Sequence, residues 1–91
     1  MKTPAPAPVA ATNDQLVAML RTIGERDAEQ LDSRSLGRSL GWTAAQTADS
    51  LAAAKARLLI WGIRVGGNPA PCFEDIELTV QGRRFLIEAE R

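Results

Sequence analysis

Few side chains in this sequence could carry out catalysis or bind a metal. The 91 residues include no His and one Cys, Cys72, so Ser-His-Asp catalysis, Cys-His catalysis and the usual zinc sites lack the residues they need. Glu74, Asp75 and Glu77 could suggest acid–base work or a divalent cation, but strand alternation would place Asp75 and Glu77 together on a solvated outer face. Cys72 is expected to pack as a small residue, and a pair between the Cys72 residues of two protomers stays open. We therefore expect no enzyme activity, no cofactor and no metal.

The remaining candidates for chemistry are cations that could bind phosphate. Eleven Lys and Arg balance eleven Asp and Glu, which excludes a strongly basic coat protein for nucleic acid. The charge is unevenly distributed, because residues 1–32 and 67–91 each have a net charge of −2, whereas residues 33–66 have a net charge of +4. This distribution still permits a protein that binds nucleic acid with one face.

The ends and the apolar runs of the chain indicate one domain. The longest apolar runs are far shorter than the roughly 18–20 residues that span a bilayer, and the N-terminal residues lack the apolar core of a signal peptide. Residues 1–11 alternate Pro with small residues, which predicts a disordered tail. A single Cys suits a reducing compartment. We expect a cytoplasmic protein with one folded domain over residues 12–91.

Helical spacing and a capping signal predict a first helix. Thr12 fits a capping box with Gln15, and the helix is expected to end near Gly24. Its inner face is formed by apolar residues with the spacing of one side of a helix: Leu16, Met19, Leu20 and Ile23.

Two further helices are expected around a short turn. Residues 33–40 follow a pair of good N-cap residues, Asp32 and Ser33, and carry Leu36 and Leu40 on their inner face. The pair Gly41-Trp42 separates this helix from residues 44–58, which are rich in Ala and follow Thr43 as N-cap. Two helices joined by so short a turn predict a helix-turn-helix unit.

Beyond residue 58 the apolar period changes from 3.6 to 2, which predicts a hairpin. Trp61, Ile63 and Val65 alternate with Gly62 and Arg64, so the three apolar side chains are expected on the inner face and Arg64 on the outer face. The predicted turn covers residues 66–71, and the second strand covers residues 72–79 with Ile76 and Leu78 inward. Thr79 can cap a last helix, in which small and apolar residues recur at helical spacing: Gly82, Phe85, Leu86 and Ala89.

Two stretches resemble the winged helix-turn-helix family of transcriptional regulators. Residues 36–43, Leu-Gly-Arg-Ser-Leu-Gly-Trp-Thr, look like the end of the family's second helix, its turn and the start of its recognition helix. Residues 78–86, Leu-Thr-Val-Gln-Gly-Arg-Arg-Phe-Leu, resemble the end of the wing, where a Gly three residues after Leu-Thr lets the next helix lie close. The family usually has Gly where this chain has Leu58, so the third helix must end in a left-handed Leu or end differently. The resemblance implies an α+β winged helix-turn-helix fold with three helices, a two-stranded wing and a short C-terminal helix.

The resemblance also implies binding to double-stranded DNA. Periodicity places Thr47, Leu51, Ala54 and Leu58 on the buried side of the third helix and leaves mostly Ala outside, with Asp49 among them. Arginines of the second helix would hold phosphates, the wing arginine would meet a phosphate or the minor groove, and polar residues of the third helix would approach bases. The expected DNA-binding residues are Arg34, Arg38, Thr43, Gln46, Ser50, Arg57 and Arg64.

These expectations lead to two candidate functions. The first is a small sequence-specific regulator, bacterial or phage, that acts by occupying its operator. It would bind as a homodimer through the first and last helices, with contacts from Met19, Phe85, Leu86 and Ile87. The second is a winged-helix adaptor that binds no DNA and docks a protein on the alanine face of the third helix.

Overall fold

The computed structural model describes residues 12–26, 31–67 and 70–91. These residues form an α+β fold with four helices and a two-stranded antiparallel hairpin. The order is α1 (Asn13–Glu25), α2 (Ser33–Leu40), α3 (Ala44–Ala56), β1 (Ile60–Val65), β2 (Cys72–Leu78) and α4 (Val80–Ala89). This arrangement is compatible with a winged helix. The predicted tail, residues 1–11, and residues 68–69 of the predicted turn lie outside the described residues.

The helices begin at the residues that the sequence predicts. The Thr12 hydroxyl accepts a hydrogen bond from the Gln15 amide at 3.2 Å, and the Gln15 side chain accepts one from the Thr12 amide at 3.1 Å, which confirms the capping box. Thr43 caps α3, and Gln46 completes a second capping box there. Asp32 caps α2 by accepting from the Ser35 amide at 2.8 Å. These signals are local, so they do not depend on the tertiary fold.

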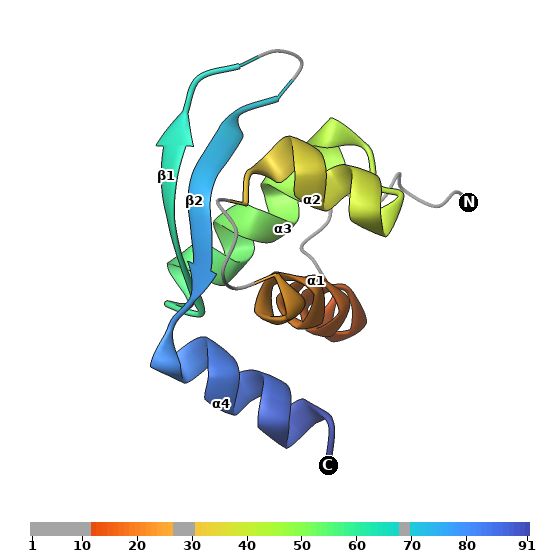
Figure 1. Ribbon diagram of the computed structural model, residues 1–91, viewed down its shortest axis with the longest axis vertical. Helices are drawn as coiled ribbons and strands as arrows, with labels where there is room; N and C mark the ends of the chain where they lie inside the picture. The colour runs from red at the N-terminus through yellow and green to blue at the C-terminus, as the bar shows by residue number, and fades with distance from the viewer. Residues whose placement is uncertain (1–11, 27–30, 68–69) are drawn as a thin grey trace, which may run out of the picture.

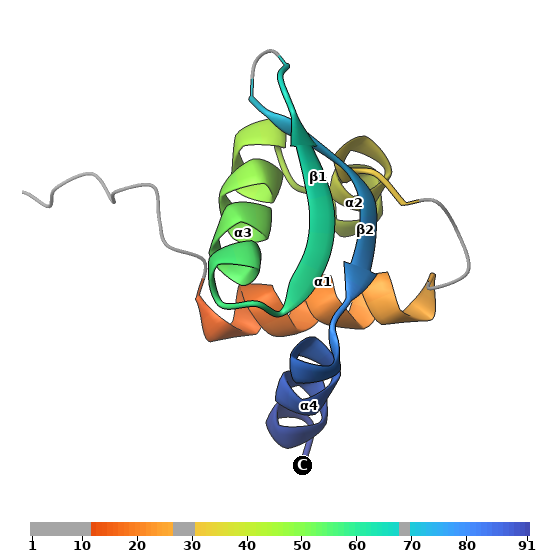
Figure 2. The ribbon, with the colours of Figure 1, turned by 90° about the vertical axis from the view of Figure 1, so that its left-hand side faces the viewer.

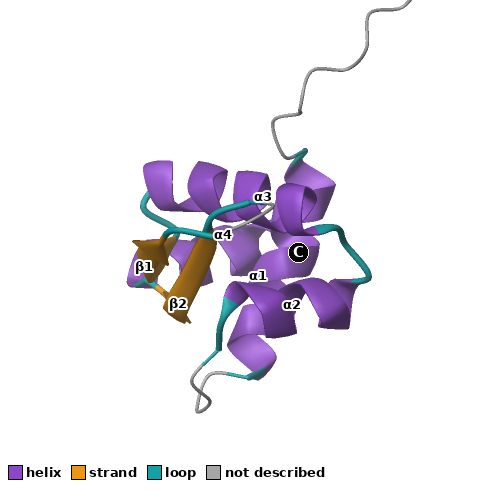
Figure 3. Cartoon of the chain, turned by 90° about the horizontal axis from the view of Figure 1, so that it is seen from above, coloured by secondary structure: helices purple, strands orange, loops and turns teal. Residues whose placement is uncertain are grey.

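The core lies between the first three helices and one face of the hairpin (Figure 1). The predicted inner face of α1 is fully buried, as are Leu36 of α2 and Ile76 of β2. Seen from above in Figure 3, the two strands lie at one side of the helices. The helix α2 crosses α3 closely at Gly37, where an added Cβ would lie 2.8 Å from the Thr47 hydroxyl oxygen. Together these contacts fix α3 against α2 with its opposite side exposed.

The hairpin turns a different face to the core than the sequence predicts. Trp61 is 66% exposed and Ile63 is 56% exposed, whereas Ile60 is buried and Gly62 faces Phe73 and Ile76. The expectation that Trp61 and Ile63 point inward is therefore wrong. A strand pattern fixes which residues share a face, but only tertiary packing decides which face is covered. Here the helices cover the face that carries Ile60.

Two positions at which the winged helix-turn-helix family has Gly lie where α3, β1 and α4 meet. They are occupied by Leu58 and Gly82 in this chain. Leu58 takes the left-handed conformation, at φ 61°, in the place where the family has Gly. Its amide donates to the Lys55 carbonyl and the Leu59 amide donates to the Ala54 carbonyl, so α3 ends in a Schellman motif. Leu58 is 66% exposed, so its predicted place on the buried stripe is wrong. At Gly82 of α4 an added Cβ would collide with the Leu59 carbonyl oxygen, which confirms the close approach expected there.

Among the described residues no helix is both long and apolar enough to cross a membrane.

Candidate nucleic-acid interface

Two neighbouring pockets lie beside α3. The first has a volume of about 250 Å³ and lies between α2, the start of α3 and the residues that lead into β2. The second has a volume of about 410 Å³ and lies between α3 and the hairpin, with Ala52 and Ala56 of α3 on one wall. Both pockets are lined by Pro71, so they form one surface, which we call the α3 groove.

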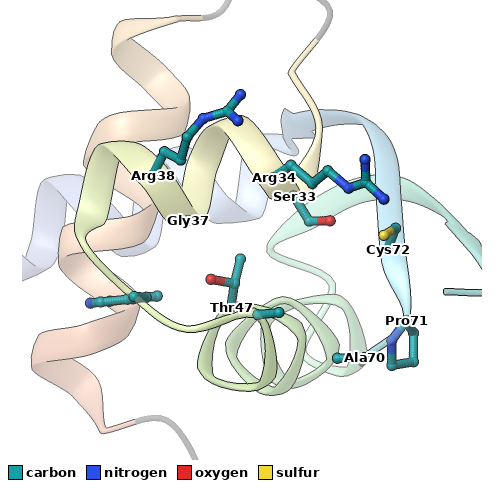
Figure 4. A pocket seen from close by; sticks show the side chains of 10 residues that line it. Ser33, Arg34, Gly37, Arg38, Thr47, Ala70, Pro71 and Cys72 are labelled. Atoms are coloured by element: carbon teal, nitrogen blue, oxygen red, sulfur yellow. The ribbon is translucent and has the colours of Figure 1, made fainter. Parts of the chain in front are cut away.

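Four cations line the α3 groove. Arg34 and Arg38 come from successive turns of α2 and border the first pocket, as Figure 4 shows. Lys55 and Arg64 border the second pocket, and the Lys55 ammonium donates to the Gly62 carbonyl at 2.8 Å. The one acidic residue among those that line the two pockets is Asp49, so the lining of the groove has a net charge of +3.

The hairpin supplies Arg64 from its covered face. Arg64 is exposed and lines the second pocket opposite α3, while Trp61 and Ile63 lie on the other face of β1. Arg64 is therefore on the opposite face from Trp61 and Ile63 as predicted, but it lies on the side that faces α3 and not on the outer side. This reversal brings Arg64 into the same groove as Lys55.

The exposed side of α3 is small and largely apolar. Ala45, Ala52 and Ala56 are exposed, in agreement with the predicted outer face. Thr43 and Gln46 are exposed at the start of α3, where the Gln46 side-chain oxygen is held by the Thr43 amide at 2.9 Å. The amide NH₂ of Gln46 is then the donor that this helix offers for a base edge.

Four predicted DNA-binding residues do not line the two pockets of the groove: Thr43, Gln46, Ser50 and Arg57. Ser50 is only 3% exposed, so the expected approach of its hydroxyl to DNA is wrong. Helix α3 packs against α1, α2 and both strands, and its buried sector is wider than the predicted stripe, as the burial of Ala48 beside Thr47 also shows. Arg57 lies at the other end of α3, where its guanidinium stacks over the Phe85 ring at 5.0 Å from the centroid.

Lys55 is the member of the groove that sequence reasoning left out of the candidate site. It is counted in the basic segment 33–66, but no spacing rule places it beside β1. The contact with the Gly62 carbonyl depends on how the hairpin folds back along α3. A residue of this kind can be found only once the tertiary contact is known.

The other candidate groups are Cys72 and the carboxylates. Cys72 is half-buried in the first pocket. Among the described residues no group of three or more His, Cys, Asp or Glu is placed to hold a metal ion. Hydrogen bonding from the Ser35 amide lowers the pKa of Asp32, in keeping with its role as the cap of α2.

The surface predicted to form a dimer is only partly available. Met19 is fully buried in the core, so it cannot contact a second protomer. Phe85 and Leu86 are partly buried against the core, and Ile87 is exposed. Helix α4 is also tied to α1 by the ion pair between Arg21 and Glu90 at 2.7 Å.

Comparison of the chain with protein-family models, with curated proteins and with solved structures gives no match.

Proposed function

We propose that the chain is a winged helix-turn-helix protein that binds double-stranded DNA through the α3 groove and regulates transcription by occupying its site. The observation that carries this proposal is the convergence of four cations from three elements, α2, α3 and β1, on the exposed side of one helix. A cytoplasmic location is part of the proposal, because such a regulator must reach the genome.

The groove has the charge arrangement that a DNA backbone requires. An α-helix fits the major groove, and the phosphates of the two strands then pass on either side of it. Arg34 and Arg38 lie beside α3 on the side of α2. Lys55 of α3 itself and Arg64 of β1 lie on the side of the hairpin. In this proposal each pair binds the phosphates of one strand.

The outer face of α3 determines what kind of contact the bases receive. Alanine side chains allow the helix backbone to approach the base pairs closely and can contact thymine methyl groups. Gln46 is the residue suited to hydrogen-bond a base, and Asp49 is suited to accept from cytosine. We therefore assign most of the affinity to phosphate contacts and limited sequence preference to α3.

The test is the salt dependence of binding to duplex DNA. Four phosphate contacts correspond to a slope of about −3.6 in log K against log salt, which is a loss of affinity of about 150-fold between 50 and 200 mM salt. Fluorescence anisotropy with a labelled duplex of mixed sequence measures this slope. Absence of binding at 50 mM salt would exclude the proposal and favour the adaptor, which docks a protein on the alanine face of α3.

We also propose that two protomers associate through α4 and that the resulting dimer binds a two-fold DNA site. Its exposed Ile87 and partly buried Leu86 border a pocket between α1 and α4 of about 340 Å³, and a second copy can contribute the same residues by symmetry. Light scattering at micromolar concentration tests the proposal, which predicts twice the mass of the chain. A monomer that binds DNA would contradict the dimer and leave the DNA proposal intact.

A further inference from the structure

The outer face of the hairpin carries an apolar surface that the DNA proposal does not use. Trp61 is 66% exposed and Ile63 is 56% exposed on this face, two residues apart on β1. Figure 2 looks onto the hairpin, and no described element passes in front of the two strands. In this view α4 lies beyond the end of the strands, and the other helices lie behind or beside them. The pocket between α3 and the hairpin is lined by Arg64 and Phe73, and not by Trp61 or Ile63. Exposed apolar surface of this kind is typical of an interaction site. A second feature is needed to identify what binds there.

The second feature is a pair of carboxylates set directly opposite the apolar residues. In the antiparallel register Trp61 pairs with Glu77 and Ile63 pairs with Glu74, and directly opposed residues point to the same face of a sheet. Both glutamates are exposed. Trp61, Ile63, Glu74 and Glu77 therefore form one surface, which we call the outer hairpin surface.

A backbone irregularity creates this arrangement. Glu74 and Glu77 are three residues apart, so in a regular strand they would point to opposite faces. The register shifts between Trp61 and Ile63, because two residues of β2 oppose one residue of β1 there. Within this bulge Asp75 has φ 54°, a left-handed conformation that is unfavourable for a residue other than Gly. The bulge therefore brings both glutamates beside the apolar pair.

The charge of the outer hairpin surface decides between possible occupants. A second copy stacked face to face would bring Glu74 and Glu77 of both copies together, and like charges in a closed interface are unfavourable. DNA is excluded by the same carboxylates. A protein segment that carries both apolar and basic side chains satisfies the apolar residues and the carboxylates at once.

We propose that the outer hairpin surface docks a basic, amphipathic segment of a partner protein. The partner places an apolar side chain against Trp61 and Ile63 and an Arg or Lys beside Glu74 and Glu77. Trp61, Ile63 and Glu77 line neither pocket of the α3 groove, and Glu74 borders a separate pocket beside Arg34. The apolar contact with this partner therefore leaves the α3 groove open to DNA. The proposal does not depend on DNA binding and can be tested without DNA.

The probe is a labelled 15-residue helical peptide with Leu on one face and Arg on the other, and its counterparts are a Leu/Glu peptide and a Ser/Arg peptide of the same spacing. Anisotropy with the full chain should show binding of the Leu/Arg peptide that is at least about tenfold tighter than binding of either counterpart. The indole signal of Trp61 in a ¹⁵N spectrum, assigned with Trp61→Phe, should shift on addition of this peptide and not change on dilution of the free protein.

Two variants and a matched control locate the binding. The double variant Trp61→Ala/Ile63→Ser should lower affinity for the Leu/Arg peptide at least about tenfold, and Glu74→Gln/Glu77→Gln should lower it several-fold and weaken its salt dependence. The control Val80→Ala/Glu88→Gln changes an exposed apolar residue and a carboxylate elsewhere on the surface and should bind as the natural chain does. Urea unfolding verifies that every variant folds, which is expected because all six changed side chains are exposed.

Several results would overturn the proposal. These are no binding of the Leu/Arg peptide at millimolar concentration, equal binding of the Leu/Glu peptide, and equal affinity in the Trp61→Ala/Ile63→Ser variant. A Trp61 signal that moves with protein concentration alone would assign the surface to a second copy. None of these results bears on the salt-dependent binding of DNA, so the two proposals fail separately.

Discussion

The turn between α2 and α3 offers a clean test of the backbone geometry that orients α3. Gly41 has φ 71°, and its amide donates to the Arg38 carbonyl at 3.3 Å while the Trp42 amide donates to the Gly37 carbonyl at 3.0 Å. No other atom lies within 4 Å of the position that a Cβ on Gly41 would take. A change of Gly41→Ala therefore acts through backbone conformation and not through a clash.

The size of the effect follows from two opposing contributions. A left-handed conformation costs a residue with a Cβ about 1–2 kcal/mol, and Ala restricts the unfolded chain by about 0.4–1 kcal/mol relative to Gly. We expect Gly41→Ala to lower the free energy of unfolding by about 1 kcal/mol. The matched control is Gly66→Ala, because Gly66 also has open space around it but does not have a positive φ. This change should be neutral or stabilising by up to about 1 kcal/mol.

Urea unfolding followed by circular dichroism measures both variants. For a domain of this size the dependence on urea is about 1 kcal/mol per molar, so the two midpoints should differ by about 1–2 M, with Gly41→Ala the lower. Equal midpoints would refute the left-handed turn at Gly41 and with it the orientation of α3 relative to α2.

Three further predictions concern packing, capping and the face of the hairpin. Gly82→Ala should lower the free energy of unfolding by more than about 2 kcal/mol, because the added Cβ meets a backbone carbonyl. The control Gly62→Ala, whose Cβ would have its nearest neighbour at 3.7 Å, should lower it by less than about 1 kcal/mol. Similar losses in the two variants would contradict the close approach of α4. Asp32→Ala should lower the free energy of unfolding by about 1 kcal/mol at pH 7, because it removes the cap of α2. Since the folded-state pKa of Asp32 is lowered, this loss should shrink as the pH falls from about 4. An equal loss at pH 3 and pH 7 in urea unfolding would contradict the role of the charge. Trp61→Ser should change the free energy of unfolding by about 0.5 kcal/mol or less. Phe73→Ala, which empties a fully buried site, should lower it by about 3–5 kcal/mol. A large loss in Trp61→Ser would show that the face of the hairpin with Trp61 is covered.

Features encoded within about two turns of helix could be predicted from the sequence. The capping box of Thr12, the N-cap of Thr43 and the four-residue inner face of α1 depend on near neighbours only, and the structure shows all of them. The close packing at Gly82 was also expected, because the spacing of Leu-Thr and Gly in residues 78–86 resembles a recurrent junction.

Features that depend on which surfaces meet could not be predicted. The alternation in β1 separates Arg64 from Trp61 in either orientation, and only the covering of one face by helices decides which of them faces α3. The bulge at Asp75 leaves no signal in a strand pattern, since Asp is not the residue that a left-handed position favours most. Ser50 is buried because α3 packs against four elements. Helical periodicity predicts one buried stripe, and it does not predict how many elements cover the helix.

The candidate site was predicted in part. Arg34 and Arg38 share a face of α2 because they are four positions apart in the helix, and their place beside α3 follows from the short turn. The position of Arg57 in the sequence, at the flank of the exposed face of the third helix, is as suitable for DNA binding. In the structure the chain reverses at Leu58, and the Arg57 guanidinium stacks on Phe85 of α4. Lys55 enters the site for a related reason, because β1 folds back along α3 and offers it a carbonyl.

The central claim, that DNA binds along the α3 groove, is tested most directly by charge-matched variants. Arg34→Gln/Arg38→Gln removes two charges from the groove, and Arg84→Gln/Arg91→Gln removes two exposed charges from the C-terminal end of the chain. The measurement is the slope of affinity for a duplex against salt between 50 and 200 mM. We predict that the groove variant reduces the loss of affinity from about 150-fold to about 12-fold, because two of four phosphate contacts are gone, and that the control keeps the full slope. Equal slopes for the two variants would contradict binding through the α3 groove.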